Sequence, residues 1–163
     1  MNVLVLCTGN SARSILGEVI LNTRGAGRLA AFSAGSQPKG AVHPGAMRML
    51  AKRGIDTAGL NSKSWNVFTG PDAPTIDLVI TVCGSAAGEA CPVFPGTPVR
   101  VHWGLPDPAA VSGDDAAVDA AFAQTWDWIT MRAEALLGLP FETMARDALQ
   151  ARLAEIGAME GAA

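Results

Sequence analysis

The sequence has no tyrosine, no long hydrophobic run and only three cysteines. Its 163 residues carry a formal net charge of -3, so no basic excess favours nucleic acid or an anionic membrane as a partner. No apolar stretch reaches the length that spans a membrane, and the start of the chain lacks the basic segment of a secretory signal. We therefore expect a cytoplasmic protein. An odd number of cysteines in a reducing compartment argues against a structural disulfide framework and favours catalytic thiol chemistry.

Apolar runs and helical periodicity alternate along the chain. Short apolar runs predict four strands, at residues 3–6, 30–34, 76–82 and 99–103. Helical spacing of apolar residues predicts helices at about residues 14–23, 44–51, 114–137 and 141–156. His43 is the expected cap of the second helix and Asp114 or Asp115 that of the third, and residues 84–98 are expected to form a loop.

This alternation predicts an α/β fold, a three-layer domain with a four-stranded parallel sheet between helices. We expect residues 1–163 to form a single domain, in which residues 140–163 are a C-terminal helical extension. Ligands of open parallel sheets bind beyond the carboxyl ends of the strands. Cys7, Cys83 and Asp107 all lie at or just after such ends, which makes this edge the expected site.

The segment Cys7-Thr-Gly-Asn-Ser-Ala-Arg13-Ser14 joins the first predicted strand to the first predicted helix. Its backbone N–H groups and the positive end of the helix dipole would surround one point, where a tetrahedral oxyanion fits. These amides and the Ser14 hydroxyl would hold Cys7 as a nucleophilic thiolate. The guanidinium of Arg13 matches two oxygens of a phosphate-like anion. The expected binding loop comprises Thr8, Gly9, Asn10, Ser11, Ala12, Arg13 and Ser14. The alternative is a buried, inert cysteine at a strand end.

Asp107 stands between Pro106 and Pro108, which restrict the backbone on both sides. A carboxyl group held over an oxyanion pocket can protonate a leaving oxygen, so Asp107 is the expected general acid. Aspartate and proline are also common in turns, and a purely structural turn is the competing interpretation.

Cys83 and Cys91 flank a segment of small, flexible residues that could form a disulfide in one state and a short helix in another. Three interpretations compete. The two cysteines could simply be packed in a loop, or all three cysteines could bind a metal ion with His102, although the spacing matches no common zinc pattern. In the third, Cys83 attacks an adduct on Cys7, and Cys91 then attacks the resulting disulfide.

Taken together, these motifs resemble those of a known family. The loop from Cys7 to Ser14 together with Asp107-Pro108 is similar to the low-molecular-weight protein tyrosine phosphatase fold. The stretch from Val82 to Pro92, followed by His102-Trp-Gly-Leu-Pro-Asp-Pro108, resembles the bacterial arsenate reductases built on that fold, which are commonly coupled to thioredoxin. The resemblance covers roughly residues 2 to 137, and the last helix is an extension present in only some relatives.

The resemblance implies that Cys7 attacks arsenate bound by the loop and Arg13, while Asp107 helps a hydroxide leave as water. It also implies that Cys83 then releases arsenite by forming a Cys7–Cys83 disulfide, which Cys91 converts to Cys83–Cys91. Thioredoxin, or glutaredoxin with glutathione, would reduce that disulfide. No flavin, nicotinamide or metal cofactor is implied, and phosphate or sulfate would compete with arsenate.

Three departures from the family are visible. Ala12 stands where many relatives have a cysteine that the relay does not need. Some relatives bind potassium beside the loop through Asn, Glu, Ser and Asp. Asn10, Glu18 and Ser33 match the first three of these ligands, and Trp65 stands at the fourth position. The stretch Ala109-Ala110-Val111 lacks the aromatic residues with which phosphatases grip phosphotyrosine.

Two other functions remain open from the sequence. A low-molecular-weight phosphatase would need only Cys7, Arg13 and Asp107. A non-enzymatic thiol sensor or metal-binding module would use the three thiols and leave the oxyanion loop without a purpose.

Overall fold

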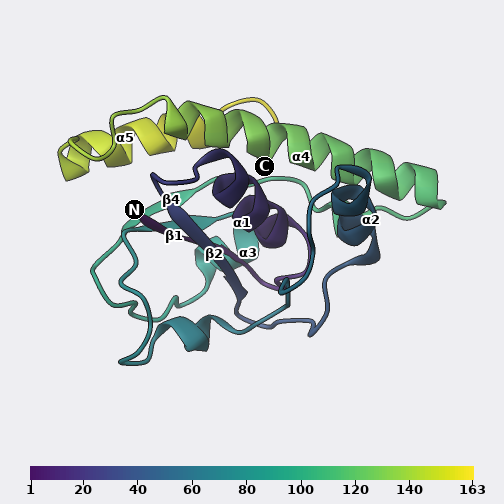
Figure 1. Cartoon of the computed structure of the whole chain (residues 1–163), viewed down its shortest axis with the longest axis horizontal. Helices are drawn as coiled ribbons and strands as arrows, with labels where there is room; N and C mark the ends of the chain where they lie inside the picture. Colours follow the sequence, from purple (N-terminus) through teal and green to yellow (C-terminus); the bar gives the residue numbers. More distant parts are fainter.

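The computed structural model describes residues 1–163 and contains a four-stranded, all-parallel sheet in the order β2-β1-β3-β4 (Figure 1). The strands are β1 (Asn2–Cys7), β2 (Ala30–Gly35), β3 (Leu78–Thr81) and β4 (Val99–His102). The α-helices are α1 (Arg13–Arg24), α2 (Pro44–Lys52), α3 (Gly84–Gly88), α4 (Asp115–Leu137) and α5 (Arg146–Gly157). Two 3-10 helices complete the chain, η1 (Trp65–Phe68) and η2 (Pro108–Ala110). The predicted α/β fold is confirmed.

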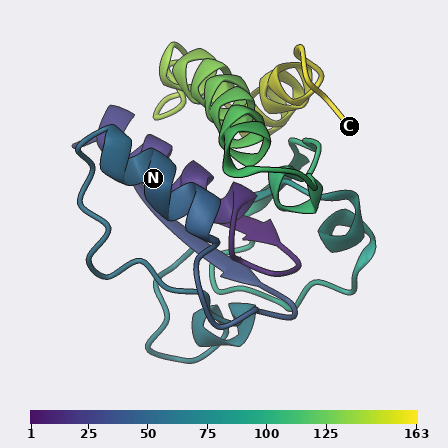
Figure 2. The same ribbon diagram turned by 90° about the vertical axis from the view of Figure 1, so that its right-hand side faces the viewer.

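The two faces of the sheet are covered differently. Alternate residues of β1 point to opposite faces, as a strand requires. Val3 and Val5 join a large core under α1, α4 and α5, whereas Leu4 and Leu6 join a smaller cluster that includes Phe68 of η1. Figure 2 shows α4 and α5 stacked over α1 on one side of the sheet, with η1 and long loops on the other. The second outer layer is therefore built mostly from loops.

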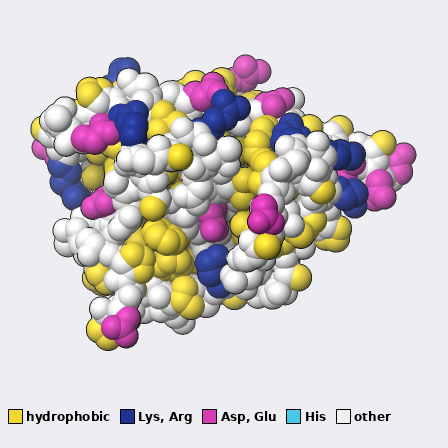
Figure 3. All heavy atoms as spheres, viewed as in Figure 1, with side chains coloured by type: hydrophobic (Ala, Val, Ile, Leu, Met, Phe, Trp, Pro, Cys, Tyr) yellow, Lys and Arg dark blue, Asp and Glu magenta, His cyan; other side chains and the backbone are white.

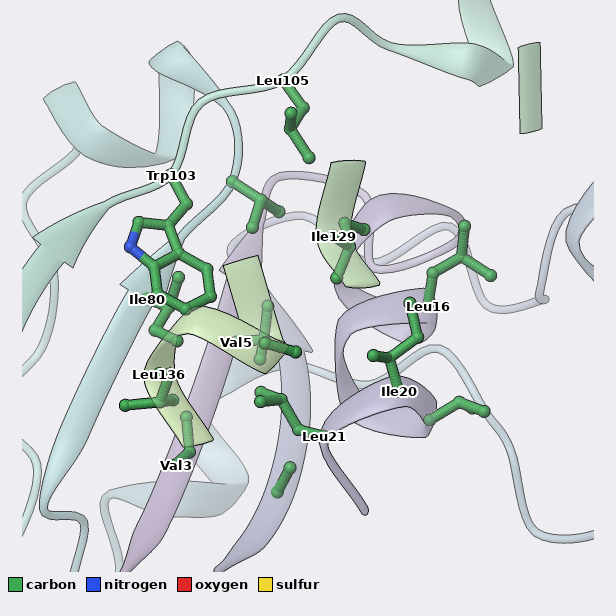
Figure 4. Close-up of a cluster of buried hydrophobic side chains, with 14 of the residues drawn as sticks. Val3, Val5, Leu16, Ile20, Leu21, Ile80, Trp103, Leu105, Ile129 and Leu136 are labelled. Carbon is green, nitrogen blue, oxygen red and sulfur yellow. The ribbon is translucent and has the colours of Figure 1, made fainter. Parts of the chain in front are cut away.

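The large core joins strands and helices that are far apart in the sequence. Figure 4 shows side chains of β1, α1, β3 and α4 in one apolar cluster, with Trp103 and Leu105 from the segment after β4. The Trp103 indole N–H donates to the carbonyl of Leu153 in α5 at 3.0 Å, so the C-terminal helix is tied to the end of β4. This packing fixes the position of the chain that leads to Asp107.

Some boundaries differ from the sequence prediction. Residues 84–88, within the expected loop, form helix α3, which the sequence allowed as one state of the segment between Cys83 and Cys91; the Cys83 side chain accepts from the Ala86 N–H at 3.4 Å and caps this short helix. The third strand is shorter than the apolar run at 76–82 and spans Leu78–Thr81. The last helix begins at Arg146 and not at residue 141, since the N–H of Thr143 donates to the carbonyl of Pro140 in a separate turn. The predicted caps His43 and Asp114 are both confirmed.

Charged side chains of both signs are interspersed over the face drawn in Figure 3. No helix combines the length and the apolar character that a membrane span needs.

Arg132 is a fully buried cation without a carboxylate partner, and it generates a prediction about stability. Its guanidinium donates to the carbonyls of Trp128, Gly157, Met159 and Glu160, at 3.1, 3.4, 3.0 and 3.1 Å respectively. Gly157 is the last residue of α5, and Met159 and Glu160 follow it, so three of these four carbonyls lie at or just beyond the C-terminal end of that helix. Replacing Arg132 with Met should lower the free energy of unfolding by about 2–4 kcal/mol in urea titrations, since buried acceptors lose their donors.

The matched control is Arg152→Met, which removes an exposed Arg152–Glu155 ion pair. That change should cost less than about 0.5 kcal/mol. Equal losses for the two variants would contradict the role assigned to Arg132.

Candidate active site

A cleft opens at the carboxyl ends of the parallel strands, where the sequence places its reactive residues. Residues 7–13 other than Asn10 form its floor, and Gln37, Lys39, Cys83, Ser85 and Asp107 form its sides. Four of the five predicted catalytic residues, Cys7, Arg13, Cys83 and Asp107, thus share one cavity. No aromatic side chain lines it.

The Cys7 thiol lies at the base of the loop and is buried. Its Sγ accepts the Asn10 N–H at 3.1 Å and lies 2.9 Å from the Ser14 hydroxyl. Burial raises the pKa of Cys7 above its ordinary value, and the hydrogen bonds from Ser14 and Asn10 oppose that rise. The sequence showed these hydrogen-bond donors but not the extent to which the fold buries the thiol.

The Asn10 side chain sets the direction of the hydrogen bonds behind the nucleophile. Its Oδ1 accepts the backbone N–H of Lys63 at 2.8 Å, so its Nδ2 must face the two serines. Nδ2 donates to Ser14 Oγ at 2.8 Å and to Ser33 Oγ at 3.0 Å. Because Ser14 Oγ accepts this bond, its own proton is free to point at the sulfur of Cys7. Asn10 adopts φ +42°, a left-handed conformation that asparagine tolerates.

Arg13 and Asp107 meet at the mouth of the cleft. Arg13 Nη2 lies 3.3 Å from Asp107 Oδ2, and Nη1 donates to the Leu105 carbonyl at 2.8 Å. Asp107 Oδ1 also accepts the N–H of Ala109 at 3.1 Å and caps η2. The turn interpretation and the active-site interpretation of Asp107 are thus compatible, since one oxygen serves each.

Gln37 and Lys39 line the cleft but were missed from the sequence. The backbone N–H groups of Gln37 and Lys39 donate to the carbonyls of Thr8 and Gly9, both at 2.9 Å. These bonds hold the segment against residues 7–14, the nucleophile loop. Lys39 forms no ion pair within the chain, so it adds an uncompensated positive charge beside Arg13. The position of this segment directly after β2 was the available signal, because the strand-end rule applies to β2 as well.

The structure brings Cys83 to the cleft but not Cys91. Cys83 Sγ lies 3.5 Å from the Thr8 hydroxyl and caps α3, and like Cys7 it is buried and lines the cleft. Cys91 lies beyond α3, in a second cleft with Glu89 and His102, and packs against the smaller apolar cluster. The cysteines and His102 therefore do not share one cavity, and no three His, Cys, Asp or Glu side chains converge as metal ligands.

The residues that match a potassium site do not fit that ion here. Asn10 Oδ1 already accepts an N–H, and Ser33 Oγ accepts from Asn10 while donating to the carboxylate of Glu18. Trp65, at the fourth position, packs against the smaller apolar cluster and offers no oxygen. Cations of this kind require several free oxygen ligands, which this cluster does not supply.

Comparison with known proteins agrees with this geometry. Residues 2–151 match the family model described as low molecular weight phosphotyrosine protein phosphatase. A protein of Halalkalibacterium halodurans named arsenate reductase is 35% identical over 130 residues, which cover 80% of this chain and 90% of that protein. A Bacillus subtilis protein of the same name is 32% identical over equal shares of both chains. A solved structure, described as an arsenate reductase in the phosphate binding state, is similar with a TM-score of 0.64 and 31% identity, covering 83% of this chain and 95% of the other.

The contact between Ser14 and Cys7 predicts how the thiol should titrate. Removing the Ser14 hydroxyl takes away a hydrogen bond that opposes the raised pKa of Cys7, so the thiolate should form at higher pH. In Ser14→Ala, we expect the iodoacetamide alkylation of Cys7 near neutral pH to slow by about tenfold, the value of one hydrogen bond to a charged group. The whole rate–pH curve should move to higher pH, as measured by mass spectrometry of the Cys7 peptide.

Ser112→Ala removes an exposed hydroxyl that neither lines the cleft nor bonds to Cys7, and it serves as the control. An unchanged curve for Ser14→Ala would show that Ser14 does not stabilise the thiolate.

Proposed function

This chain belongs to the low molecular weight phosphotyrosine protein phosphatase family, and we propose that within it the chain reduces arsenate to arsenite. The observation that carries the proposal is the buried thiol of Cys83 in the same cleft as Cys7. Phosphate ester hydrolysis needs one nucleophilic thiol, whereas the reduction of arsenate needs two electrons, which a pair of thiols supplies. Relatives named arsenate reductase, at 35% and 32% identity, support the same reaction.

Arsenate would bind in the loop that follows Cys7. The loop and the first residue of α1 line the cleft, where their N–H groups would donate to the anion, and Arg13 and Lys39 bring positive charge to the same cleft. Arsenate and phosphate share shape and charge, so phosphate and sulfate would compete for the same site. The absence of aromatic side chains from the lining favours a small anion over a phosphotyrosine ring.

In the first step, the thiolate of Cys7 attacks arsenic and an arsenic–oxygen bond breaks. Asp107 is the proposed general acid, since its carboxyl group lies at the mouth of the cleft beside Arg13. It protonates the leaving hydroxide, which departs as water. Because burial raises the pKa of Cys7, deprotonation before attack becomes a distinct requirement that the Ser14 and Asn10 hydrogen bonds ease.

In the second step, Cys83 attacks the sulfur of the Cys7–arsenic adduct. A Cys7–Cys83 disulfide forms, the sulfur–arsenic bond breaks, and its electron pair remains on arsenic, which leaves as arsenite. The hydroxyl of Thr8 and the N–H of Ala86 lie near Cys83 Sγ and would stabilise its thiolate.

In the third step, Cys91 attacks Cys83 and releases Cys7 as a thiolate. Helix α3 separates the two cysteines and would have to unwind for this step. It is only five residues long, and Ala86 is its one buried residue while Gly84 and Gly88 face open space, so little packing opposes the change. An external thiol donor, thioredoxin or glutaredoxin with glutathione, would then reduce the Cys83–Cys91 disulfide.

Serine substitutions at the second and third cysteines test the function. With a thiol donor system and NADPH, we expect Cys83→Ser and Cys91→Ser each to lower multiple-turnover arsenate reduction by at least about 100-fold, because serine cannot form a disulfide. Slow hydrolysis of p-nitrophenyl phosphate should persist within about threefold in both variants, since hydrolysis uses Cys7, Arg13 and Asp107.

Failure of the native protein to consume NADPH in response to arsenate, with every donor system tried, would contradict the proposal. If phosphate ester hydrolysis was fast in that case, the chain would be a phosphatase.

A further inference from the structure

A partly buried ion pair lies behind the nucleophile loop, outside the cleft. Lys63 Nζ is 3.7 Å from Glu18 Oε2, and their side chains are 25% and 18% exposed. Neither residue lines the cleft, and no step of the proposed reaction uses either one. A carboxylate withdrawn from water is costly unless a cation or several donors compensate it.

The carboxylate of Glu18 is joined to the nucleophile by hydrogen bonds. It accepts the hydroxyl of Ser33, which accepts from Asn10, and Asn10 also donates to Ser14 beside Cys7. Ser33, Asn10 and Ser14 are all fully buried. A change at the Glu18 end of this series therefore reaches the loop through groups that have no access to water.

Lys63 contacts this network at two points. Its backbone N–H donates to Asn10 Oδ1 at 2.8 Å, and its carbonyl accepts the N–H of Gly35 at the end of β2 at 2.9 Å. The backbone of Lys63 is thus fixed between the loop and the sheet, and its ammonium group, 3.7 Å from Glu18 Oε2, also donates to the Asn61 carbonyl at 3.3 Å. The same residue sets the orientation of the Asn10 amide and supplies the positive charge.

We propose that the ammonium group of Lys63 is a built-in cation for the nucleophile loop, which it positions through Glu18, Ser33 and Asn10. Lys63 is then a positioning residue and not a catalytic one, because it does not line the cleft and does not contact Cys7. The cluster offers too few free oxygens for potassium, as described above, and the lysine supplies the charge in its place. This inference goes beyond the proposed reaction, since it concerns oxyanion binding of any kind.

Phosphate is the probe, so that the test does not depend on arsenate reduction. Its affinity is measured by the protection of Cys7 from iodoacetamide at a single pH, and thermal unfolding is followed in parallel. For Lys63→Met we expect phosphate affinity to fall by about tenfold, as for an uncompensated charge near the loop, and the melting temperature to fall by about 3–8 °C. Lys63→Arg should retain affinity within about threefold, because it retains the charge.

Two further variants separate the effect of the Lys63–Glu18 ion pair from other effects of the substitution. Adding Glu18→Gln to Lys63→Met should recover at least half of both losses, since no buried carboxylate is left without a cation. Lys52→Met removes a surface ion pair with Asp119 and should leave phosphate affinity unchanged. The melting temperature of the native chain should be the same in about 100 mM potassium chloride and in choline chloride of equal ionic strength.

Native phosphate affinity in Lys63→Met would overturn the proposal, as would a potassium-specific rise in the melting temperature of the native chain. If Lys63→Met does not fold, the double variant decides the matter. Recovery of folding and phosphate binding supports the built-in cation, and failure to recover either overturns it.

Discussion

The side chain of Asn10 is the contact on which the geometry of the site depends. The backbone N–H of this residue donates to the Cys7 sulfur. Its side-chain amide bonds to Ser14 in helix α1, to Ser33 in strand β2 and to the backbone of Lys63 before η1. Each of these partners belongs to a different part of the chain. The loop is therefore held by the fold and not by its own sequence, which explains how a left-handed asparagine is maintained at the centre of an anion site.

The thiols of Cys83 and Cys91 occupy different environments, and this difference decides which exchange step needs a structural rearrangement. Cys83 closely follows β3 and is buried in the same cleft as Cys7, so its position follows from the sheet. Cys91 lies on the far side of α3 and faces a second cleft. A relay through three thiols would therefore combine one fixed exchange, between Cys7 and Cys83, with one that requires rearrangement of a short helix.

Much of the fold could be predicted from hydrophobic patterning. The alternation of apolar runs with helical segments gave the parallel sheet, and the strand-end rule brought Cys7, Cys83 and Asp107 together, as the structure confirms. The exact ends of the short elements were harder to predict. The small residues after Cys83 left a loop and a short helix both open, and the cap that the Cys83 side chain supplies favours the helix. The turn after Pro140 delays the last helix to Arg146.

The long-range parts of the site could not be predicted, because they depend on contacts between distant segments. The Lys63 N–H reaches Asn10 across more than fifty positions of sequence, and Lys39 enters the cleft only because its backbone pairs with Gly9. Burial of Cys7 is also a tertiary property. It reverses the direction of the pKa shift expected from the loop donors alone.

The most direct measurement for the proposed relay is the disulfide formed in a single turnover. The fully reduced chain is mixed with arsenate in the absence of any reductant, quenched in acid, alkylated and mapped by mass spectrometry. We expect a Cys83–Cys91 disulfide, alkylated Cys7 and one equivalent of arsenite. Three alkylated cysteines with unchanged arsenate would contradict the account.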